Sequence, residues 1–252
     1  MSDHGTIILV PSVHFSLTHR RRVRAAIREM APDLVAVELD ESRFERLEGD
    51  TGPDIAELTR ELPPPTAAAY SALRALQRSV VRLYGLDPEY TDMEAAIETA
   101  AELETDIALI DEPIDEIMRA LSRRLGPLTI PKAMLRMQSM GPEEYADQLE
   151  VLSLPFEEIT SGDDVQPAID HLRRLLPEVA TVLIDRRDRA MAERLHALRR
   201  EGDDVIAVVG AGHHNGIERR LEELESASAD GASTATVPIK TPARSVTRIP
   251  IQ

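Results

Sequence analysis

Histidines and carboxylates follow the apolar runs of this chain, close to the points where those runs end. His14 comes soon after the first run, Glu38 lies near the end of the second, and Asp111 follows the third. His213 comes after the fourth run, within the stretch GAGHH at 210–214. Imidazole and carboxylate groups are common protein ligands of divalent metal ions. If the fold brings these residues together, the combination therefore indicates a divalent metal site.

The elements that must position these residues are four short runs of apolar, β-branched residues. The runs are continuously apolar rather than alternating, which is typical of strands covered on both faces. Patterns for helices separate them, so we predict a three-layer α/β fold with a mostly parallel sheet flanked by helices. Ligands bind at the carboxyl ends of such strands. The predicted strands are 6–10, 34–39, 106–110 and 205–209, and the helices beside them are 18–31, 92–104 and 216–226.

The predicted domain organisation is one α/β domain at 1–225. Two Pro-interrupted stretches without a strand pattern, at about 52–90 and 113–200, are predicted to be helical insertions. The remaining 226–252 is rich in Ser, Ala and Thr and then in Pro. We predict a C-terminal tail there, with a weak pattern for a final edge strand.

A helix predicted over 178–198 carries an arginine in its apolar stripe. At about 100° per residue, Arg187 projects into the middle of that stripe, and Asp188 lies at its edge. A buried arginine needs an anionic partner because it stays charged. Two interpretations remain open: a structural ion pair beneath the sheet, or a pocket residue that orients Glu38, Asp40 or a substrate carboxylate.

The candidate residues differ in how specific their signal is. A lone His14 after a strand is also typical of a turn or a helix cap. Glu38 is a sharper signal, because a buried carboxylate without a partner is costly. His214 stands beside His213 and must point elsewhere, so we expect it at the surface.

Composition excludes several classes of protein. The 252 residues hold 29 basic and 45 acidic residues, a net charge of −16, and only Lys132 and Lys240 are lysines. Nucleic-acid binding needs positive surface, so no nucleic-acid partner is expected, whereas solubility in concentrated salt is consistent with this charge. The absence of cysteine excludes disulfides and thiolate chemistry. No apolar stretch reaches the ~18–20 residues of a membrane span, and MSDHGTIILV is unlike a signal peptide, so we expect a cytoplasmic protein.

Five blocks of the sequence, taken in order, resemble the TraB family, whose wider superfamily includes the Tiki proteins. The family pattern has a Gly-x-x-His after the first strand, and a second such motif in its closing block. The resemblance covers about residues 6–224. The five blocks are PSVH at 11–14, PDLVAVELDESRFERL at 32–47, DMEAAIETA at 92–100 followed by LIDE at 109–112, RRDRAMAERL at 186–195, and VVGAGHHNGI at 208–217.

Three positions depart from the family pattern. Pro11 stands where a Gly is usual, Glu112 where an Arg is usual, and Arg186 where a Glu is usual. The chain also shows no counterpart of the membrane-spanning C-terminal part of many prokaryotic relatives. We therefore expect a divergent, soluble member of the family.

The resemblance to the Tiki branch implies metal-dependent peptide hydrolysis. His14, Glu38 and His213 would then hold a Mn, Co or Zn ion, with Glu38 either a ligand or the general base. Arg43 and Arg187 would stabilise developing negative charge or position the substrate. The residues expected to contact a peptide or small-molecule substrate are Asp40, Asp111 and Asp188.

The competing hypothesis is a binding or regulatory module without catalysis. Other TraB members are linked to shutting down peptide pheromone signals, and such a module would keep the pocket for a peptide or small ligand. The departures at Pro11, Glu112 and Arg186 favour this alternative. The sequence indicates neither the substrate nor the oligomeric state.

Overall fold

The computed structural model describes residues 5–14, 16–48, 92–126, 128–139, 141, 156–229 and 247–249. The insertion predicted at 52–90 lies outside the described residues, as does most of the predicted tail at 226–252. Among the described helices, none is both long and apolar enough to cross a membrane.

The described strands form one sheet in the order β1-β4-β2-β3-β5. Its first four strands are parallel, and β5 pairs antiparallel with β3 at the edge. The predicted mostly parallel sheet is therefore confirmed, and the weakly indicated final strand is present. The strands are β1 (Ile7–Ser12), β2 (Leu34–Val37), β3 (Asp106–Leu109), β4 (Val205–Gly210) and β5 (Thr247–Ile249).

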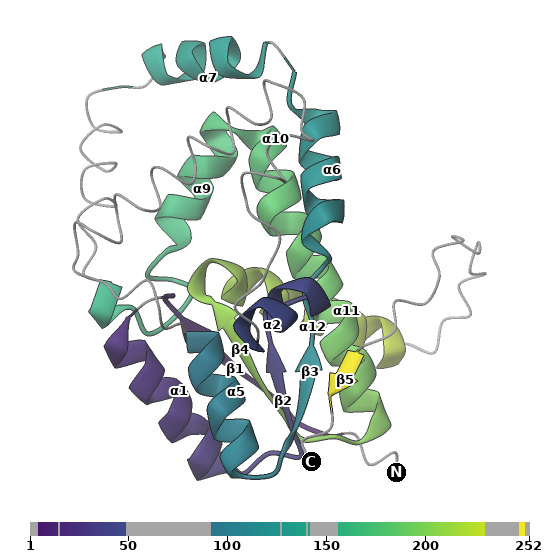
Figure 1. The fold of residues 1–252 in the computed structure, drawn as a ribbon. Helices are drawn as coiled ribbons and strands as arrows, with labels where there is room; N and C mark the ends of the chain where they lie inside the picture. Colours follow the sequence, from purple (N-terminus) through teal and green to yellow (C-terminus); the bar gives the residue numbers. More distant parts are fainter. Residues whose placement is uncertain are drawn as a thin grey trace.

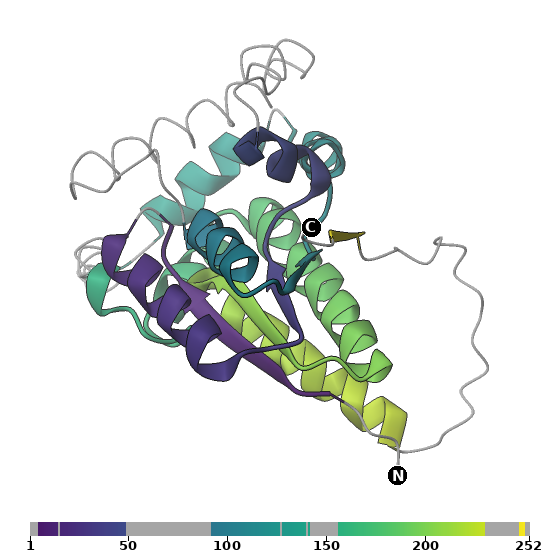
Figure 2. The same ribbon diagram turned by 60° about the horizontal axis from the view of Figure 1, so that its bottom comes forward.

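Helices cover both faces of the sheet, which explains why its strands are apolar throughout (Figures 1 and 2). On one face, α1 and α5 pack against side chains such as Val35 and Ile107. On the other face, α11 and α12 pack against side chains such as Ala36 and Ile110. This arrangement confirms the three layers. The covering helices are α1 (Leu17–Met30), α5 (Asp92–Glu102), α11 (Arg186–Glu201) and α12 (Ala211–Ala229).

A further group of helices lies beyond the carboxyl ends of the strands (Figure 1). Ile117, Met118 and Leu121 of α6 pack there against Val182, forming a small separate core. The described part of 113–200 contains helices and no strand. The elements are α2 (Glu41–Glu48), α6 (Ile114–Arg124), α7 (Thr129–Gln138), η1 (Phe156–Glu158), α9 (Gln166–Leu175), α10 (Pro177–Ala180) and η2 (Thr181–Asp185).

Two predicted element boundaries were wrong. The strand β2 ends at Val37, so Glu38 follows the strand instead of interrupting it. The helix α12 begins at Ala211 rather than near 216, which places His213 in its first turn. The two glycines of GAGHH suggested a loop, but one of them ends β4 and the other lies inside the helix.

The helix predicted over 178–198 is interrupted by a π-helical turn. The turn η2 (Thr181–Asp185) separates α10 from α11. The π-turns of proteins are frequent at functional sites. Arg187 comes directly after it and is largely buried, with 14% of its side chain exposed, as the helical periodicity predicts.

Candidate functional site

Glu38 lies at the end of β2 with only 5% of the residue exposed. Its Oε2 accepts a hydrogen bond of 2.6 Å from the backbone N–H of Gly210, at the end of the neighbouring β4. Its Oε1 accepts a hydrogen bond from the guanidinium of Arg187. Burial raises the pKa of this carboxyl, but the electrostatic interactions with His213 and Arg187 outweigh burial and lower it to about 2. Glu38 is therefore a carboxylate at neutral pH.

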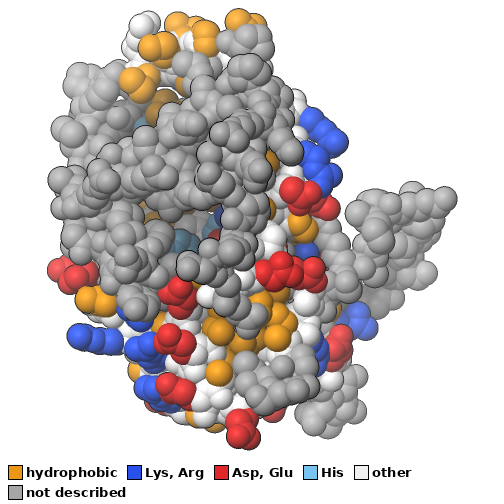
Figure 3. Space-filling model, in the orientation of Figure 1, with side chains coloured by type: hydrophobic (Ala, Val, Ile, Leu, Met, Phe, Trp, Pro, Cys, Tyr) orange, Lys and Arg blue, Asp and Glu red, His pale blue; other side chains and the backbone are white. Residues whose placement is uncertain are grey.

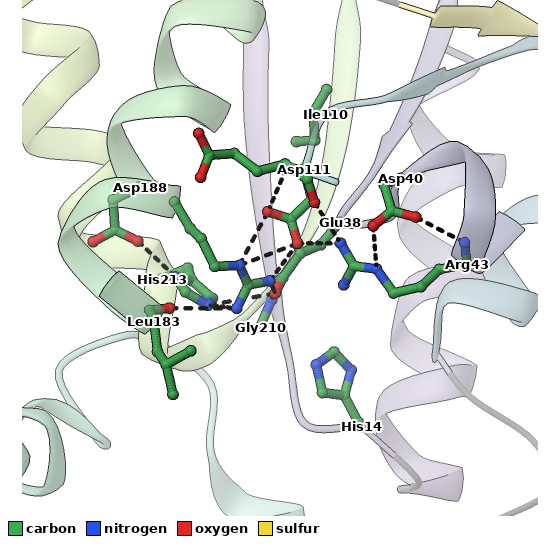
Figure 4. A network of polar contacts seen from close by, with 12 residues as sticks. His14, Glu38, Asp40, Arg43, Ile110, Asp111, Leu183, Asp188, Gly210 and His213 are labelled. Carbon is green, nitrogen blue, oxygen red and sulfur yellow. Dashed lines mark hydrogen bonds and ion pairs between the residues drawn. The ribbon is translucent and has the colours of Figure 1, made fainter. Parts of the chain in front are cut away.

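Arg187 connects three side chains of the site (Figure 4). Its Nε donates to Asp111 Oδ1 at 3.0 Å, and its Nη1 donates to His213 Nε2 at 3.0 Å. Burial lowers the pKa of Arg187, but the charges of Glu38 and Asp111 raise it above its ordinary value. The guanidinium is thus a fixed positive charge among two buried carboxylates and an imidazole.

His213 is held from its other side by Asp188 on α11. The distance between His213 Nδ1 and Asp188 Oδ1 is 2.6 Å. Because Nε2 accepts from Arg187, Nδ1 carries the proton and donates to Asp188. Gly216, one turn further along α12, leaves room for this carboxylate, since a Cβ there would lie 1.8 Å from Asp188 Oδ2. The close approach of α11 and α12 thus requires glycine at this position and fixes the imidazole.

His14 is held in the same way by a residue that the sequence analysis did not predict. The distance between His14 Nδ1 and Asp92 Oδ1 is 2.8 Å, and Asp92 is fully buried at the start of α5. The Asp92 carboxylate raises the pKa of His14 to about 9. An aspartate at the start of a predicted helix is typical of a cap, so no local pattern pairs it with a histidine 78 positions away.

The three predicted metal ligands gather around Gly210 (Figure 4). A Cβ on this glycine would lie 3.2 Å from Glu38 Oε2, 3.5 Å from His14 Nε2 and 3.6 Å from His213 Cδ2. The carboxyl ends of β1, β2 and β4 therefore bring His14, Glu38 and His213 to one small space. Any side chain at position 210 would reduce that space.

The carboxylates predicted to bind substrate all interact within the protein. Asp111, which is buried, also accepts from Arg43 Nη2 at 2.5 Å. Arg43 Nε donates to Asp40 Oδ2 at 3.1 Å, and the backbone N–H of Ile114 donates to the same oxygen at 2.7 Å. These contacts tie α2 and α6 to the end of the sheet, and Asp188 is engaged by His213.

The departures at Glu112 and Arg186 form one ion pair. Arg186 Nε lies 2.6 Å from Glu112 Oε2, and Glu112 is fully buried. Where the family pattern has an Arg and a Glu, this chain therefore has a Glu and an Arg in contact. The two changes compensate each other, which removes one reason to infer a damaged site.

The other departure and the second histidine lie at the periphery of the site. Pro11 pairs with Val209 in β1, an edge strand, where proline is tolerated. His214 Nδ1 lies 3.1 Å from Asn215 Oδ1 and is half-buried. It is thus directed to a neighbour on its own helix, whereas His213 contacts Glu38, Arg187 and Asp188.

Within the described ranges, no three His, Asp or Glu side chains are already arranged as a metal-binding group. The contacts of Arg187 provide a physical reason. Its guanidinium binds both Glu38 Oε1 and His213 Nε2, two of the atoms that a metal ion would use. A divalent ion held by these side chains would have to displace it from at least one of them.

The chain resembles an archaeal protein over most of its length. It is 30% identical to an uncharacterized protein of Methanocaldococcus jannaschii over 230 residues, which cover 87% of this chain and 54% of the relative. The chain thus spans about half the length of that relative. The sequence pattern of the TraB/PrgY/gumN family matches residues 1–229, and the chain belongs to this family.

Proposed function

We propose that the protein is a metal-dependent hydrolase acting on a peptide or related bond, with His14, Glu38 and His213 as metal ligands. The observation that carries the proposal is the repeated pairing of imidazole and carboxylate. Asp92 holds His14 and Asp188 holds His213, both at Nδ1, and both rings lie beside Glu38. Metal-binding histidines almost always have such a partner on the ring nitrogen that faces away from the metal.

The chemistry of the donor set fits a divalent ion. Two imidazole nitrogens and one carboxylate suit Zn, Co or Mn. A divalent ion bound there would act as a Lewis acid toward the carbonyl of the substrate. Binding would require Arg187 to give up its contact with His213 Nε2, after which it keeps its hydrogen bonds to Asp111.

The residues of the chain have distinct roles in this proposal. Arg187 lies close enough to Glu38 and His213 to stabilise negative charge that develops on the substrate. Arg43 holds Asp40 and Asp111 and therefore positions the site. Glu38 acts as a ligand or as the general base. Because Asp40, Asp111 and Asp188 are engaged within the protein, we assign them to positioning rather than to substrate contact.

The test compares metal binding by the wild type with that of two variants, in which one of the adjacent residues His213 and His214 is replaced. Isothermal titration with Mn, Co and Zn should show binding by the wild type and by His214→Ala. His213→Ala should lose it, because one of three ligands is removed. Retained binding by His213→Ala, or no binding by the wild type at millimolar metal, contradicts the metal site. A screen of peptides with the loaded wild type then tests hydrolysis, and His213→Ala should show no turnover.

One observation favours a binding module without catalysis as the second candidate. Arg187 pairs with Glu38 and Asp111, and Arg43 also pairs with Asp111, so both carboxylates have cationic partners without an added metal ion. Such a module would bind peptide or small ligand without metal. A wild type that binds no metal but is stabilised against heat by peptides would support this function over the hydrolase.

A further inference from the structure

Residues 117–139 form a stretch of this acidic chain that carries no acidic residue and includes two described helices. It contains five Arg or Lys residues and no Asp or Glu, in a chain whose net charge is −16. It covers most of α6 and all of α7. The positive residues are Arg119, Arg123, Arg124, Lys132 and Arg136, of which Arg119 pairs with Asp115 and Arg136 with Glu178.

The same stretch exposes the most apolar surface. Leu128, Met134 and Leu135 are 62%, 60% and 68% exposed, which are the highest values among the large apolar residues described. Figure 3 shows hydrophobic side chains gathered at the end of the molecule where Figure 1 places α7, with Lys and Arg side chains along the flank formed by α6. Exposed apolar groups clustered in this way mark an interaction surface.

The orientation of α7 is fixed by contacts on its inner side. The hydroxyl of Thr129 is buried and accepts from the backbone N–H of Gly126 at 2.9 Å. About two turns further on, Arg136 donates to the carbonyl of Leu175 on α9 at 2.9 Å. Leu128 and Leu135 are also seven positions apart and therefore share another side of the helix, which their exposure shows to face outward. The helix is thus held with its apolar side away from the protein.

We propose that this surface, defined as the exposed residues of 117–139, docks on an anionic lipid bilayer. A helix with Leu and Met on its outer side and Lys and Arg beside them lies in the interfacial plane of a membrane. In Figure 1, α7 is the outermost labelled element at its end of the molecule. Lys and Arg side chains beside such a helix are attracted to anionic headgroups.

The acidic remainder of the chain does not prevent this contact. Charges further away than the Debye length of about 8–10 Å are largely screened at physiological salt. The bilayer therefore senses the basic residues near α7 more strongly than the acidic residues elsewhere. Attraction to the lipid then comes from this surface, and repulsion from the rest of the protein is weak.

The experiment is sedimentation of the full chain with phosphatidylcholine vesicles, with and without phosphatidylglycerol. Binding is expected to the anionic vesicles only, and to fall with salt. Arg123→Gln with Arg124→Gln should weaken it about 25-fold, about fivefold for each charge. Leu128→Ser with Leu135→Ser should abolish sedimentation. The matched controls, Arg21→Gln with Arg200→Gln and Leu17→Ser with Leu103→Ser, change exposed residues elsewhere and should bind as the wild type.

Circular dichroism establishes that each variant is folded, so that a loss of binding is due to the surface. No binding to anionic vesicles, or equal losses in the controls, overturns the proposal. Light scattering provides a separate readout. If Leu128→Ser with Leu135→Ser halves the molar mass in solution, the surface is an interface between copies and the lipid proposal is wrong. None of these outcomes depends on metal binding or hydrolysis.

Discussion

His14 and His213 are both held at Nδ1 by an aspartate, but they lie in different surroundings. The side chain of His213 is 7% exposed and contacts the buried Glu38 and Arg187, whereas that of His14 is 40% exposed. His213 belongs to the helix that follows the interior strand β4, and His14 follows the edge strand β1. The His213 half of the site is therefore part of the packed interior, and the His14 half is the side open to solvent.

Because of this difference, we expect the two halves of the site to contribute differently to stability. The ion pairs of the His213 half connect β2, β3 and α11, so that changes there affect folding as well as function. The His14 half rests on one pair between a loop and the start of α5, in which the aspartate is buried and the histidine is partly exposed. We expect changes there to affect function with little loss of stability.

The largest effect is expected for Arg187→Met. The change removes the cation shared by Glu38 and Asp111, two buried carboxylates, and should lower the free energy of unfolding by about 3–5 kcal/mol. Urea denaturation provides the measurement. Arg173→Met is the control, because its partners Asp170 and Asp185 are exposed and such pairs contribute about 1 kcal/mol or less. Equal losses in the two variants would show that the interior network is not stabilising.

A smaller effect is expected for the reversed ion pair. Glu112→Arg places two arginines in contact beside a buried backbone and should cost about 1–3 kcal/mol. Combining it with Arg186→Glu restores opposite charges and should recover most of the loss. A double variant as unstable as the sum of its two single changes would mean that the departures do not compensate each other. The comparison uses thermal or urea unfolding of all four proteins.

Replacing Asp188 and Asp92 tests whether the two halves of the site contribute differently to metal binding. Removing a carboxylate that holds a ligand histidine typically lowers metal affinity 10–100-fold. We expect Asp188→Asn to lower the metal affinity by a factor near the upper end of this range and to lower stability, because Asp188 faces a buried ring. Asp92→Asn should lower the affinity by a factor near the lower end, with less loss of stability. Titration with Zn and Mn gives the affinities, with His214→Ala as the control. A larger loss of metal affinity in Asp92→Asn than in Asp188→Asn would contradict the distinction between the two halves.

The sequence predicted those parts of the site that depend on periodicity. Continuous apolar runs gave the parallel strands, and the positions of Glu38 and His213 at strand ends followed from that topology. The helical spacing of apolar residues also placed Arg187 toward the interior. Each of these inferences uses only neighbours along the chain, for which local patterns are informative.

The parts that could not be predicted depend on contacts between distant segments. Asp92 reads as a helix cap until α5 is placed beside the end of β1. Glu112 and Arg186 read as two independent losses until α11 is seen to bring them within 2.6 Å. Gly216 carries no local turn signal, since its role is to make room for Asp188 on another helix.

The smallest effect concerns the pH dependence of stability in the His14 half. Asp92 raises the pKa of His14 from its ordinary value of 6.5 to about 9, so the folded protein holds this proton more tightly than the unfolded chain. The pair therefore contributes its full stabilisation below about pH 6.5 and loses it as the pH rises through about 9.

Urea unfolding of metal-free wild type and of His14→Gln at several pH values isolates this contribution, because all other groups are shared. The advantage of the wild type should shrink between these limits, and it should be modest because the imidazole is partly exposed. A difference that does not change with pH would show that His14 and Asp92 are held together without a charge on the ring, which would make the two halves of the site more alike than their exposure suggests.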